Sequence, residues 1–519
     1  MTAPAIEQFI QSELSGTAIN NGNNLKQKLS ELKVIPTGLS NDSRLTKKGD
    51  IFFAYPGSNQ DGRIHIHEAI ERGCSAVIWE RGGWIWDPSH KVPNIAFKDV
   101  QALMGEFAAL FFGEPTSGIH VLGVTGTNGK TTCVNWLADA FFTLGRDSAC
   151  IGTLGVNVPG RALNIGYGEN RTTPDAIALQ HTFRDLRNSG VSHISIEASS
   201  HALSQNRLNG TEIDIAIFTN LTHDHLDYHG TLEHYGIAKA RLFLFETLSQ
   251  AVINIDDDFG ADLAMILKRQ DKQVVTYSTV NKNADIFASQ SSLSINGSTF
   301  SVSTRWGFKE IKSQIVGEFN VRNMLAVLGG LLCSGVDFSK ACDAVGALRH
   351  PKGRLQRVGE KYDRYVYVDY AHTPDALSRL LATLRSLLKA PGRVITVFGA
   401  GGDRDKDKRK LMGQAVLEFS DVAIVTADNP RHEALDRIIE QIICGEEDRF
   451  IVEPDRRSAI CRAIGLSNKN DIVCIAGKGH EKYQDVSGER LPFDDYLVAE
   501  EYLKAFYFDS NQYQDCMNV

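Results

Sequence analysis

Short apolar runs alternate along this chain with longer stretches in which apolar residues recur every three or four positions. The first pattern is typical of buried strands, and the second is typical of helices that cover a sheet. The strand candidates of the middle part are Ile119–Val124, His193–Glu197, Ile215–Thr219, 250–255 and 273–278. Because helix-like stretches such as Lys130–Leu144 separate these runs, the pattern predicts α/β layers.

The pattern divides the 519 residues into three predicted domains. Residues 1–97 form a smaller N-terminal α/β domain, residues 98–347 form a central domain with a mostly parallel sheet, and residues 348–519 form a C-terminal domain. Within the central domain, the stretch 284–316 alternates polar and apolar residues, which predicts hairpins. The C-terminal domain has the spacing of a Rossmann-like parallel sheet. Its strand candidates are Tyr365–Tyr370, Val394–Phe398, Val422–Thr426 and Ile472–Ile475.

The composition is that of a folded protein, with 42% hydrophobic and 23% charged residues. A net charge of -8 argues against a dedicated nucleic-acid-binding protein. The nine cysteines are scattered and form no CxxC pair, which is typical of free thiols in a reducing cytoplasm. Neither a signal-peptide pattern nor an apolar stretch of membrane-spanning length is present. We therefore expect a cytoplasmic protein that does not insert into membranes.

A glycine-rich segment follows the first central strand and precedes the helix-like stretch. Its residues are Gly126, Thr127, Asn128, Gly129, Lys130, Thr131 and Thr132. In a strand–loop–helix turn of this kind, backbone N–H groups can point at an anion, and glycines let the backbone approach it. Lys130 would reach the β- and γ-phosphates of a nucleotide, and Thr131 would place a hydroxyl on Mg²⁺. Although Val124 stands where the usual pattern has its first glycine, the segment predicts ATP binding by a P-loop-type ATPase domain.

The loop and several later segments resemble the Mur ligases, the ATP-dependent amide-forming enzymes of bacterial cell-wall synthesis. The spacing of Val124 and Gly126 is the Mur-type version of the phosphate loop. The later segments are TTPD at 172–175, EASSH at 197–201, NLTHDHLDYHG at 220–230, DYAHTPD at 369–375, GGDRDK at 401–406, DNPR at 428–431 and GKGHE at 477–481. Together they resemble the family member that adds the third amino acid to UDP-N-acetylmuramoyl-L-alanyl-D-glutamate. The first 97 residues match least well.

The resemblance implies a reaction through an acyl phosphate, with ATP and Mg²⁺ as cofactors. The D-glutamate side-chain carboxylate attacks the γ-phosphate, the incoming amine attacks the new carbonyl group, and phosphate leaves. Lys130 is assigned to the phosphates, and Thr131, Glu197 and His225 are assigned to the metal. A carboxylate at a strand end, such as Glu197, can hold the Mg²⁺ that bridges two phosphates.

The segment around His225 is open to other interpretations when its residues are taken alone. The polar residues here are His223, Asp224, His225, Asp227 and His229. Their side chains fit a zinc site, since His and Asp are both zinc ligands, and they fit a solvated turn equally well. The resemblance assigns only His225 to a second Mg²⁺.

Lys239 lies on a predicted helix at Thr231–Leu248. From the sequence alone, the ordinary interpretation is an exposed helix lysine. The resemblance implies that CO₂ carboxylates Lys239, and the resulting anion can ligate or orient Mg²⁺. The modification needs an unprotonated amine, and therefore a lysine with a depressed pKa.

The resemblance also implies substrate contacts outside the loop. Asn320 and Asn323 would lie near the adenine base, and Arg354 and Asp369, with His372, would lie beside the nucleotide. The residues implied for the UDP-linked substrate are Ser43, Ser58, Asn59, Gln60, Arg171, Thr172, Thr173, Ser199, Gln205 and Arg207. Hydroxyl groups and an arginine suit a pyrophosphate and a peptide carboxylate. Arg171 departs from the family pattern, which often has Asn there, and it adds a charge or marks a different loop.

The segment Asp428–Arg431 indicates which amino acid is added. The family divides chiefly between meso-diaminopimelate and L-lysine, and diaminopimelate has an additional carboxylate at its far end. The planar fork of Arg431 suits that carboxylate, and lysine would leave the arginine without a partner. The residues implied for diaminopimelate are Arg404, Asp428, Asn429, Pro430, Arg431, Gly477 and Glu481. The sequence therefore predicts a diaminopimelate-adding ligase.

Two alternatives remain open at this point. A folylpolyglutamate-synthase-like ligase shares the loop and the chemistry, but it should lack the Thr172–Thr173 pair and the Asn-Pro-Arg segment. A nucleotide-dependent switch or motor would hydrolyse ATP without needing an amino-acid pocket. The run from Gly399 begins like a dinucleotide fingerprint, but Arg404 stands where the last glycine should be, so NAD is not predicted. We expect small-molecule partners, no nucleic acid and a monomer.

Overall fold

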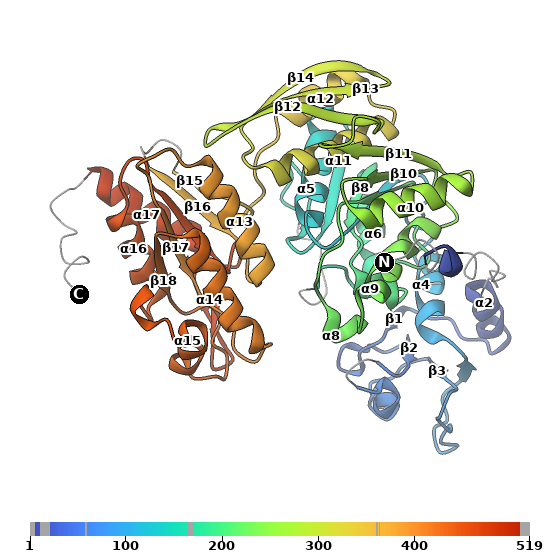
Figure 1. Ribbon diagram of the computed structural model, residues 1–519. Helices are drawn as coiled ribbons and strands as arrows, with labels where there is room; N and C mark the ends of the chain where they lie inside the picture. Colours follow the sequence, from blue (N-terminus) through green and yellow to red (C-terminus); the bar gives the residue numbers. More distant parts are fainter. Residues whose placement is uncertain are drawn as a thin grey trace. The chain divides into compact units, whose positions relative to one another are not determined.

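The computed structural model describes residues 6–10, 21–57, 60–163, 171–359, 362 and 364–508. The chain forms two compact units (Figure 1). Unit 1 comprises residues 1–289, 301–311 and 322–346, and unit 2 comprises residues 290–300, 312–321 and 347–519. The predicted α/β class with mostly parallel sheets is confirmed. The predicted domain boundaries stay a prediction.

A four-stranded parallel sheet forms the N-terminal part of unit 1. Its strands, in both spatial and chain order, are β1 (Gly38–Ser40), β2 (Asp50–Ala54), β3 (Ala76–Glu80) and β4 (Asn94–Phe97). Along β2 the side chains alternate between the two faces. Ile51 and Phe53 pack under α2 (Asn21–Glu31) and α4 (Val100–Phe111), and Phe52 packs under α3 (Ile66–Glu71). Two 3-10 turns, η1 (Ser43–Leu45) and η2 (Gly62–His65), complete this part.

The central sheet has ten strands in the order β14-β13-β12-β11-β10-β9-β5-β8-β6-β7. They are β5 (His120–Thr125), β6 (Ser148–Gly152), β7 (Gly155–Asn157), β8 (His193–Glu197), β9 (Ile215–Phe218), β10 (Gln250–Asn254), β11 (Gln273–Ser278), β12 (Ile286–Ser294), β13 (Gly297–Thr304) and β14 (Gly307–Ser313). Strand β5 pairs in parallel with β8 on one side and with β9 on the other. The chain therefore changes direction across the sheet at β5, and such a switch point opens a crevice at the carboxyl ends of the strands.

Helices cover both faces of the central sheet. They are α5 (Lys130–Thr143), α6 (Ala176–Asn188), α7 (Ser200–Ser204), α8 (Leu226–His229), α9 (Leu232–Ala240), η3 (Arg241–Leu244), α10 (Asp258–Arg269), α11 (Glu318–Cys333) and α12 (Phe338–Gly346). Helices α6 and α10 share one apolar core with the strands. The helix predicted at Thr231–Leu248 is wrong beyond Ala240. There the chain continues as a 3-10 turn that buries Leu242 and Phe243, and such turns are frequent at the ends of α-helices.

Unit 2 contains a six-stranded sheet in the order β15-β16-β20-β17-β18-β19. The strands are β15 (Gln356–Val358), β16 (Tyr365–Asp369), β17 (Val394–Phe398), β18 (Val422–Val425), β19 (Phe450–Val452) and β20 (Ile472–Ala476), followed by the hairpin β21 (Tyr483–Val486) and β22 (Glu489–Pro492). All neighbours are parallel except β15, so the predicted parallel sheet is confirmed. No helix among the described residues is long and apolar enough to cross a membrane.

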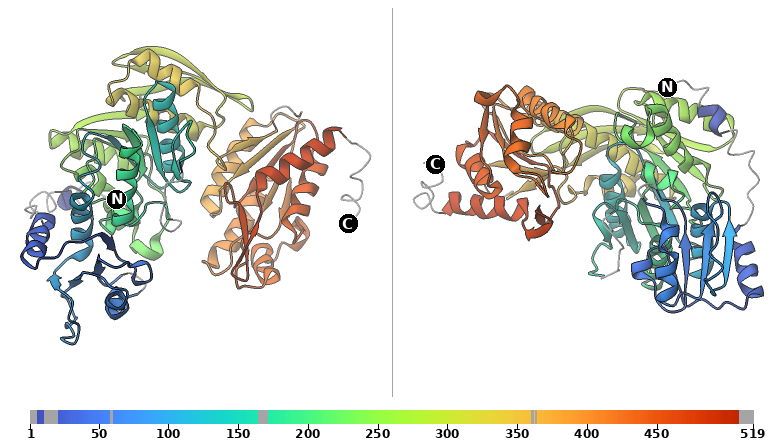
Figure 2. Two further views of the ribbon diagram at one scale, coloured as in Figure 1. Left: turned by 180° about the vertical axis from the view of Figure 1, so that it is seen from behind. Right: turned by 90° about the horizontal axis from the view of Figure 1, so that it is seen from below.

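The helices of unit 2 lie on both faces of this sheet (Figures 1 and 2). They are α13 (Pro374–Leu387), α14 (Asp407–Phe419), α15 (Leu435–Ile443), η4 (Glu447–Arg449), α16 (Arg456–Leu466) and α17 (Asp495–Phe508). Tyr367 packs with α13, α14 and α15, whereas its neighbours Val366 and Val368 pack with α16 and α17. Apolar residues on both sides of each strand explain why these strands read as continuous apolar runs in the sequence.

Candidate functional site

Three strands of the central sheet end side by side where the predicted phosphate loop begins. In the register of the sheet, Val124 lies opposite Glu197, and Thr125 lies opposite Phe218. The loops that follow β5, β8 and β9 therefore start at one edge, at the switch point. Parallel α/β sheets bind ligands at this position.

The phosphate loop takes a path that only glycine permits at two positions. Gly126 has φ 148° and Gly129 has φ 87°. A Cβ atom on Gly126 would lie 1.9 Å from Thr219 Oγ1, and one on Gly129 would lie 2.5 Å from Asn323 Oδ1. The loop is held from outside by Asn220, which accepts hydrogen bonds from the backbone N–H groups of residues 127 and 128 at 2.8 and 2.9 Å. The loop thus needs glycine at both positions, and the predicted approach of its backbone to an anion stays a prediction.

Two lysines converge on one carbonyl oxygen of the loop. Lys130 Nζ donates to Gly126 O and to Thr127 O, each at 2.8 Å, and Lys239 Nζ also donates to Gly126 O at 2.8 Å. Lys239 is only 1% exposed, and its Nζ lies 4.1 Å from the centre of the Tyr235 ring. Burial, reinforced by the positive charge of Lys130, holds the pKa of Lys239 well below its usual value of 10.5. The interpretation of Lys239 as an exposed helix lysine is wrong.

Glu197 is held rigidly at the end of β8 rather than being solvated. Its side chain belongs to a residue that is 1% exposed, and it accepts from Thr153 N at 2.7 Å and from Thr153 Oγ1 at 3.2 Å. A Cβ atom on Gly152 would lie 2.2 Å from Glu197 Oε1, so the carboxylate occupies space that a side chain there would fill. Thr153 was missed in the sequence, because nothing in a lone threonine after a strand marks it as a partner of Glu197.

The aromatic residues around His225 form a cluster on the segment after β9. His225 has φ 53°, and its ring lies 4.8 Å from that of His201 and 6.1 Å from that of Tyr235. Burial lowers the pKa of His225, and it lowers the pKa of His201 and of His229 to about 4. A neutral imidazole keeps the lone pair that a metal ion needs. His201 and Tyr235 had no role in the sequence prediction, and only their proximity in space reveals them.

The zinc interpretation of the segment 223–229 receives no support. Across the described part of the chain, no group of three or more His, Cys, Asp or Glu side chains could hold a metal ion by themselves. Mg²⁺ has a different requirement, because it keeps several waters and takes one or two protein ligands together with substrate phosphates. Glu197, His225 and the buried hydroxyl of Thr131 are compatible with that smaller set.

The residues predicted for the pyrophosphate and peptide are connected to one another beside Glu197. Thr173 Oγ1 donates to the backbone oxygen of Glu197 at 2.6 Å and lies 3.1 Å from Ser199 Oγ. Arg207 donates to Thr173 O at 2.8 Å and to Gln205 Oε1 at 2.6 Å. Burial, followed by the nearby charge of Arg171, lowers the pKa of Arg207. Two guanidinium groups this close favour an anionic ligand.

Two further residues lie beside this set, of which Thr172 was predicted and Tyr55 was not. Thr172 Oγ1 lies 3.2 Å from Thr153 Oγ1, which joins it to the Glu197 side. Tyr55, at the end of β2, was missed in the sequence; burial raises its pKa, and the charge of Arg207 acts on it in the opposite direction. A tyrosine after a buried strand looks like an ordinary core residue, so the sequence carries no signal for it.

The residues predicted for the uridine diphosphate lie on the first sheet. Ser43 is buried and donates to Glu68 Oε2 at 2.6 Å, and Gln60 Nε2 lies 2.7 Å from His65 Nε2. Ser58 and Asn59 lie outside the described residues. The hydrogen bonds of Ser43 and Gln60 thus stay within their own part of the chain, and their substrate role stays a prediction.

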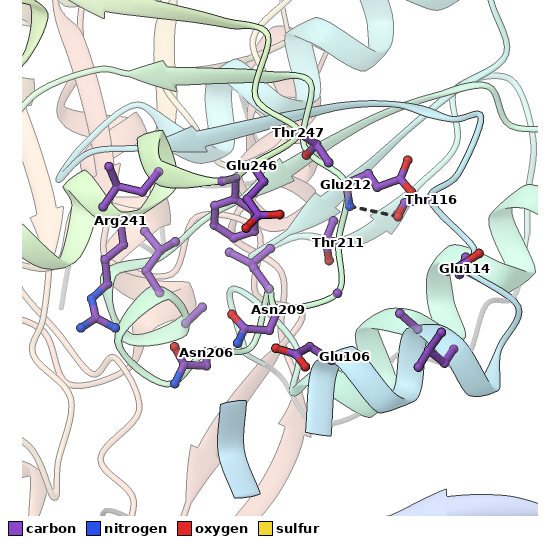
Figure 3. Close-up of a pocket in the computed structure, with 18 of the residues that line it drawn as sticks. Glu106, Glu114, Thr116, Asn206, Asn209, Thr211, Glu212, Arg241, Glu246 and Thr247 are labelled. Atoms are coloured by element: carbon purple, nitrogen blue, oxygen red, sulfur yellow. Dashed lines mark hydrogen bonds between the residues drawn. The ribbon is translucent and has the colours of Figure 1, made fainter. Parts of the chain in front are cut away.

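A separate pocket of about 620 Å³ lies in unit 1 (Figure 3). It is lined by α4, by the loop 206–212 and by the turn around Arg241, and glutamates such as Glu106 and Glu212 contribute much of its polar surface. None of the predicted site residues that the structure describes lines this pocket.

In unit 2, the loops after β17, β18 and β20 bring together most of the residues predicted for diaminopimelate. Gly402 N donates to Asn429 O at 2.9 Å, and Arg431 Nη1 donates to Gly402 O at 2.7 Å. Asn429 Nδ2 donates to Glu481 Oε2 at 2.8 Å. A Cβ atom on Gly477 would lie 2.5 Å from the buried Asp428 Oδ2, so the loops after β18 and β20 also touch. Arg404 is exposed on the loop after β17.

Two neighbouring features of unit 2 complete this region. Lys478 is fully buried and donates to Asn429 Oδ1 at 3.0 Å and to Glu481 Oε2 at 3.1 Å. The sequence prediction gave it no role, although it lies inside the motif at 477–481. A cavity of about 270 Å³ is lined by Pro430 and Arg431, whereas the other residues predicted for diaminopimelate do not line it.

The nucleotide residues predicted outside the loop divide between the two units. Asn323 of unit 1 lies against Gly129, and its role near the nucleotide stays a prediction. In unit 2, Asp369 accepts from the backbone N–H groups of residues 355 and 371 at 2.6 and 2.8 Å. Burial raises the pKa of Asp369, and the charge of Arg354 opposes that rise. Arg354 lies 4.8 Å from the Tyr370 ring centre, and Asn320 donates to the backbone oxygen of residue 316 at 2.8 Å.

The sequence and the structure are both similar to known proteins. Residues 36–112 match the model "Mur ligase family, catalytic domain", residues 124–331 match "Mur ligase middle domain", and residues 353–479 match "Mur ligase, glutamate ligase domain". The chain is 42% identical over 467 residues to the UDP-N-acetylmuramoyl-L-alanyl-D-glutamate--2,6-diaminopimelate ligase of Chromobacterium violaceum, which covers 90% of this chain and 94% of that protein.

Two solved structures are also similar. A structure of a UDP-N-acetylmuramoyl-L-alanyl-D-glutamate--2,6-diaminopimelate ligase is 36% identical with a TM-score of 0.66, covering 91% of this chain and 95% of that one. The MurF ligase of Thermotoga maritima in complex with ADP is 18% identical with a TM-score of 0.59, covering 90% of this chain and 98% of that one. At that identity, the second likeness shows the fold alone.

Proposed function

This chain belongs to the Mur ligase family and is a ligase of that class, and we propose that it joins meso-2,6-diaminopimelate to UDP-N-acetylmuramoyl-L-alanyl-D-glutamate in peptidoglycan precursor synthesis. The observation that carries the proposal is the 42% identity over 90% of the chain to a diaminopimelate ligase, because it includes the loops of Lys130 and Arg431 alike. ATP supplies the energy, as the ADP complex of the Thermotoga relative indicates for that protein.

The proposed reaction has two steps. The D-glutamate side-chain carboxylate attacks the γ-phosphorus of ATP, which forms an acyl phosphate and releases ADP. The unprotonated amine of diaminopimelate then attacks the acyl carbon, phosphate leaves, and the nitrogen loses a proton to give the amide. Both steps depend on positioning and on neutralising charge, since two anions must meet in the first step.

The residues of the phosphate loop fit ATP. Gly126 and Gly129 allow the loop to pass close to Thr219 and Asn323, and Lys130 can exchange its loop carbonyls for the phosphates. The hydroxyl groups of Thr125 and Thr222 are buried and have no hydrogen-bond partner among the described residues. Such orphan donors next to the loop favour a ligand that brings acceptors with it.

The residues of the same edge also fit Mg²⁺, which would neutralise charge on the phosphates when bound. Glu197, His225 and Thr131 would hold it. Thr153 holds the Glu197 carboxylate in place through two hydrogen bonds, and burial keeps the His225 imidazole neutral. The remaining coordination positions would be left to water and phosphate oxygens.

We propose further that Lys239 reacts with CO₂ to form a carbamate. The lone pair of the neutral amine attacks the carbon of CO₂, and the nitrogen releases one proton. The support is the burial of Lys239 and its depressed pKa, since only the unprotonated amine can react. The product would carry a negative charge a short distance from Lys130 and from the proposed metal position.

The proposed substrates divide between the two units. The cluster of Thr173, Ser199 and Arg207 would bind the UDP-linked peptide, and the loops that carry Arg404 and Arg431 would bind diaminopimelate. Arg431 would meet the far-end carboxylate, while Glu481 and Asp428 would accept from ammonium groups. We propose that the enzyme works as a monomer in the cytoplasm.

An amino-acid panel tests the proposed function. Phosphate release from ATP is measured with the UDP-linked dipeptide and with diaminopimelate, lysine or ornithine, and each substrate is also omitted in turn. We expect release only when the UDP-linked dipeptide and diaminopimelate are both present. Release that needs neither would indicate a switch, and release with a folate acceptor would indicate the folylpolyglutamate-synthase-like alternative.

A further inference from the structure

Two loops at the carboxyl edge of the unit 2 sheet carry the arginines proposed for diaminopimelate. The loop after β17 carries Arg404, and the loop after β18 carries Arg431. A molecule with a carboxylate at each end can use both arginines only if the loops keep a fixed separation. The residues that set this separation therefore decide how well the site recognises a molecule of that length.

Glu433 connects the two loops through a direct hydrogen bond of its side chain. It lies two residues after Arg431, and its Oε1 accepts from the backbone N–H of Asp403 at 2.6 Å, next to Arg404. Its carboxylate also accepts two hydrogen bonds of 3.0 Å from Arg409. The hydrogen bonds from Arg409 and from Asp403 N lower the pKa of Glu433 to about 2, so the carboxylate stays charged at neutral pH.

Arg409 fixes the orientation of Glu433 by its hydrogen bonds to the carboxylate. Its side chain has no exposed surface, and besides Glu433 it donates to Gln441 Oε1 at 2.6 Å and to Gly401 O at 3.0 Å. The Arg409 guanidinium thus contacts the start of the loop after β17, the Glu433 carboxylate on the loop after β18, and helix α15. The planar fork of arginine allows this, because its donors point in fixed directions.

The backbones of the two loops are also in close contact next to these hydrogen bonds. A Cβ atom on Gly402 would lie 1.9 Å from Pro430 O and 3.3 Å from the Cβ of Glu433. The Arg431 guanidinium donates to Gly402 O in the same place. The Glu433 contacts therefore act where the two loop backbones already touch, and they add to the fixed separation of the loops.

We propose that Glu433 is a positioning residue that sets the separation of Arg404 and Arg431 and thereby the selection of an amino acid with two carboxylates. This inference rests on the proposed function and deepens it. An amino acid with one carboxylate, such as lysine, needs only one of the two arginines. Loss of the fixed separation should therefore weaken diaminopimelate binding more than lysine binding.

Glu433→Gln tests the inference, since it keeps the size of the side chain and removes its charge. We expect the KM for diaminopimelate to rise about tenfold, because a small misplacement of a binding group has an effect of this order or larger. The KM for ATP and for the UDP-linked dipeptide, and kcat, should stay within about threefold, and the preference for diaminopimelate over lysine should fall. Glu440→Gln, at an exposed position of α15, is the matched control and should leave the three KM values, kcat and the preference unchanged.

An unchanged KM and an unchanged preference in folded Glu433→Gln would overturn the inference. A parallel change in kcat and in all three KM values would also overturn it, because a purely structural role predicts that result. If Glu433→Gln does not fold, Glu433→Asp serves instead, since it keeps the charge and shortens the reach; the same rise in KM is expected.

Hydrogen exchange separates this inference from the proposed function. In the protein without substrates, we expect the amides of residues 400–406 to exchange faster in Glu433→Gln than in the wild type. If the wild type proves inactive with diaminopimelate, the proposed function fails, and faster exchange still supports the coupling of the loops. Equal exchange in the two proteins refutes the coupling whatever the substrate.

Discussion

Replacing Lys239 tests the central feature of the phosphate site. The Nζ atoms of Lys130 and Lys239 both lie 2.8 Å from Gly126 O, so they are no more than twice that distance apart. Two ammonium groups at that separation repel each other by about 3 kcal/mol at an effective dielectric constant of about 20. Lys130 is partly exposed and can stay charged, whereas Lys239 is 1% exposed and loses its proton more easily.

The depressed pKa of Lys239 has a definite effect on stability. Between that pKa and the unfolded value of 10.5, the unfolded chain binds more protons than the folded chain. The free energy of unfolding of the wild type therefore rises with pH between these two pKa values. Compared with a variant that lacks this amine, the wild type is least stable below the folded pKa. This difference in stability disappears as the pH rises to 10.5. We expect Lys239→Met to be more stable than the wild type at neutral pH, with a gain that shrinks as the pH is raised.

Replacing Lys239 should lower the activity of the enzyme, although it raises the stability of the fold. Loss of one preorganised charged group costs about 100- to 1,000-fold in kcat, and we expect Lys239→Ala to fall in this range. Added formate should restore part of the activity of Lys239→Ala by standing in for the carbamate. Phosphate release measures kcat, and ¹³C-bicarbonate should produce a carbamate signal in the wild type that Lys239→Ala lacks.

An exposed lysine provides the control for these measurements. Lys268→Met, in the last turn of α10, should change neither the stability profile nor kcat. The reasoning fails if Lys239→Ala keeps wild-type activity without formate. It fails equally if the stability of Lys239→Met follows the wild type at every pH, because the folded amine would then be an ordinary charged lysine.

Three further changes test other parts of the molecule. Arg431→Ala should lose most diaminopimelate activity while the KM for ATP stays unchanged, and an unchanged preference over lysine in the amino-acid panel would contradict the assignment. Gly129→Ala, at φ 87°, should weaken ATP binding in calorimetry, whereas Gly145→Ala, at φ 77° with nothing within 4 Å of its Cβ, costs only about 1–2 kcal/mol of backbone strain and should bind ATP normally. Arg456→Met should destabilise unit 2 by about 3–5 kcal/mol in thermal melts, because it leaves a buried carboxylate unpaired. The neighbouring Arg457→Met breaks an exposed ion pair and should cost less than about 1 kcal/mol; equal losses would refute the difference in burial.

The sequence predicted the buried strands almost residue by residue and the short edge strands poorly. The runs at His193–Glu197 and Val394–Phe398 coincide with β8 and β17, and the near-continuous apolar run of β17 is typical of a parallel strand covered on both faces. Strands such as β1 and β15 have three residues each and lie at sheet edges, where so short a segment shows no period. The phosphate loop was predictable because its chemistry is contiguous in the chain.

The partners of the site residues were not predictable, because they are contiguous only in space. Thr153 reaches Glu197 across neighbouring strands, and Tyr235 reaches Lys239 across one turn of α9. Neither residue type is unusual at its position in the sequence. The motifs identified the groups that can carry chemistry, whereas the packing decides which of these groups are held in place.

The charged residues show this difference most clearly, since charged side chains are usually exposed and the structure buries several of them. Lys239, Arg409, Arg456 and Lys478 are all at most 1% exposed. Burying a cation is costly unless it is neutralised or well paired, so each must have a compensating arrangement. Arg409, Arg456 and Lys478 have carboxylate partners, and all three hold loops that carry proposed substrate residues. Among the described residues, Lys239 contacts a carbonyl oxygen and an aromatic ring, and burial lowers its pKa well below 10.5. The same burial that fixes geometry in unit 2 thus makes the Lys239 amine easier to deprotonate.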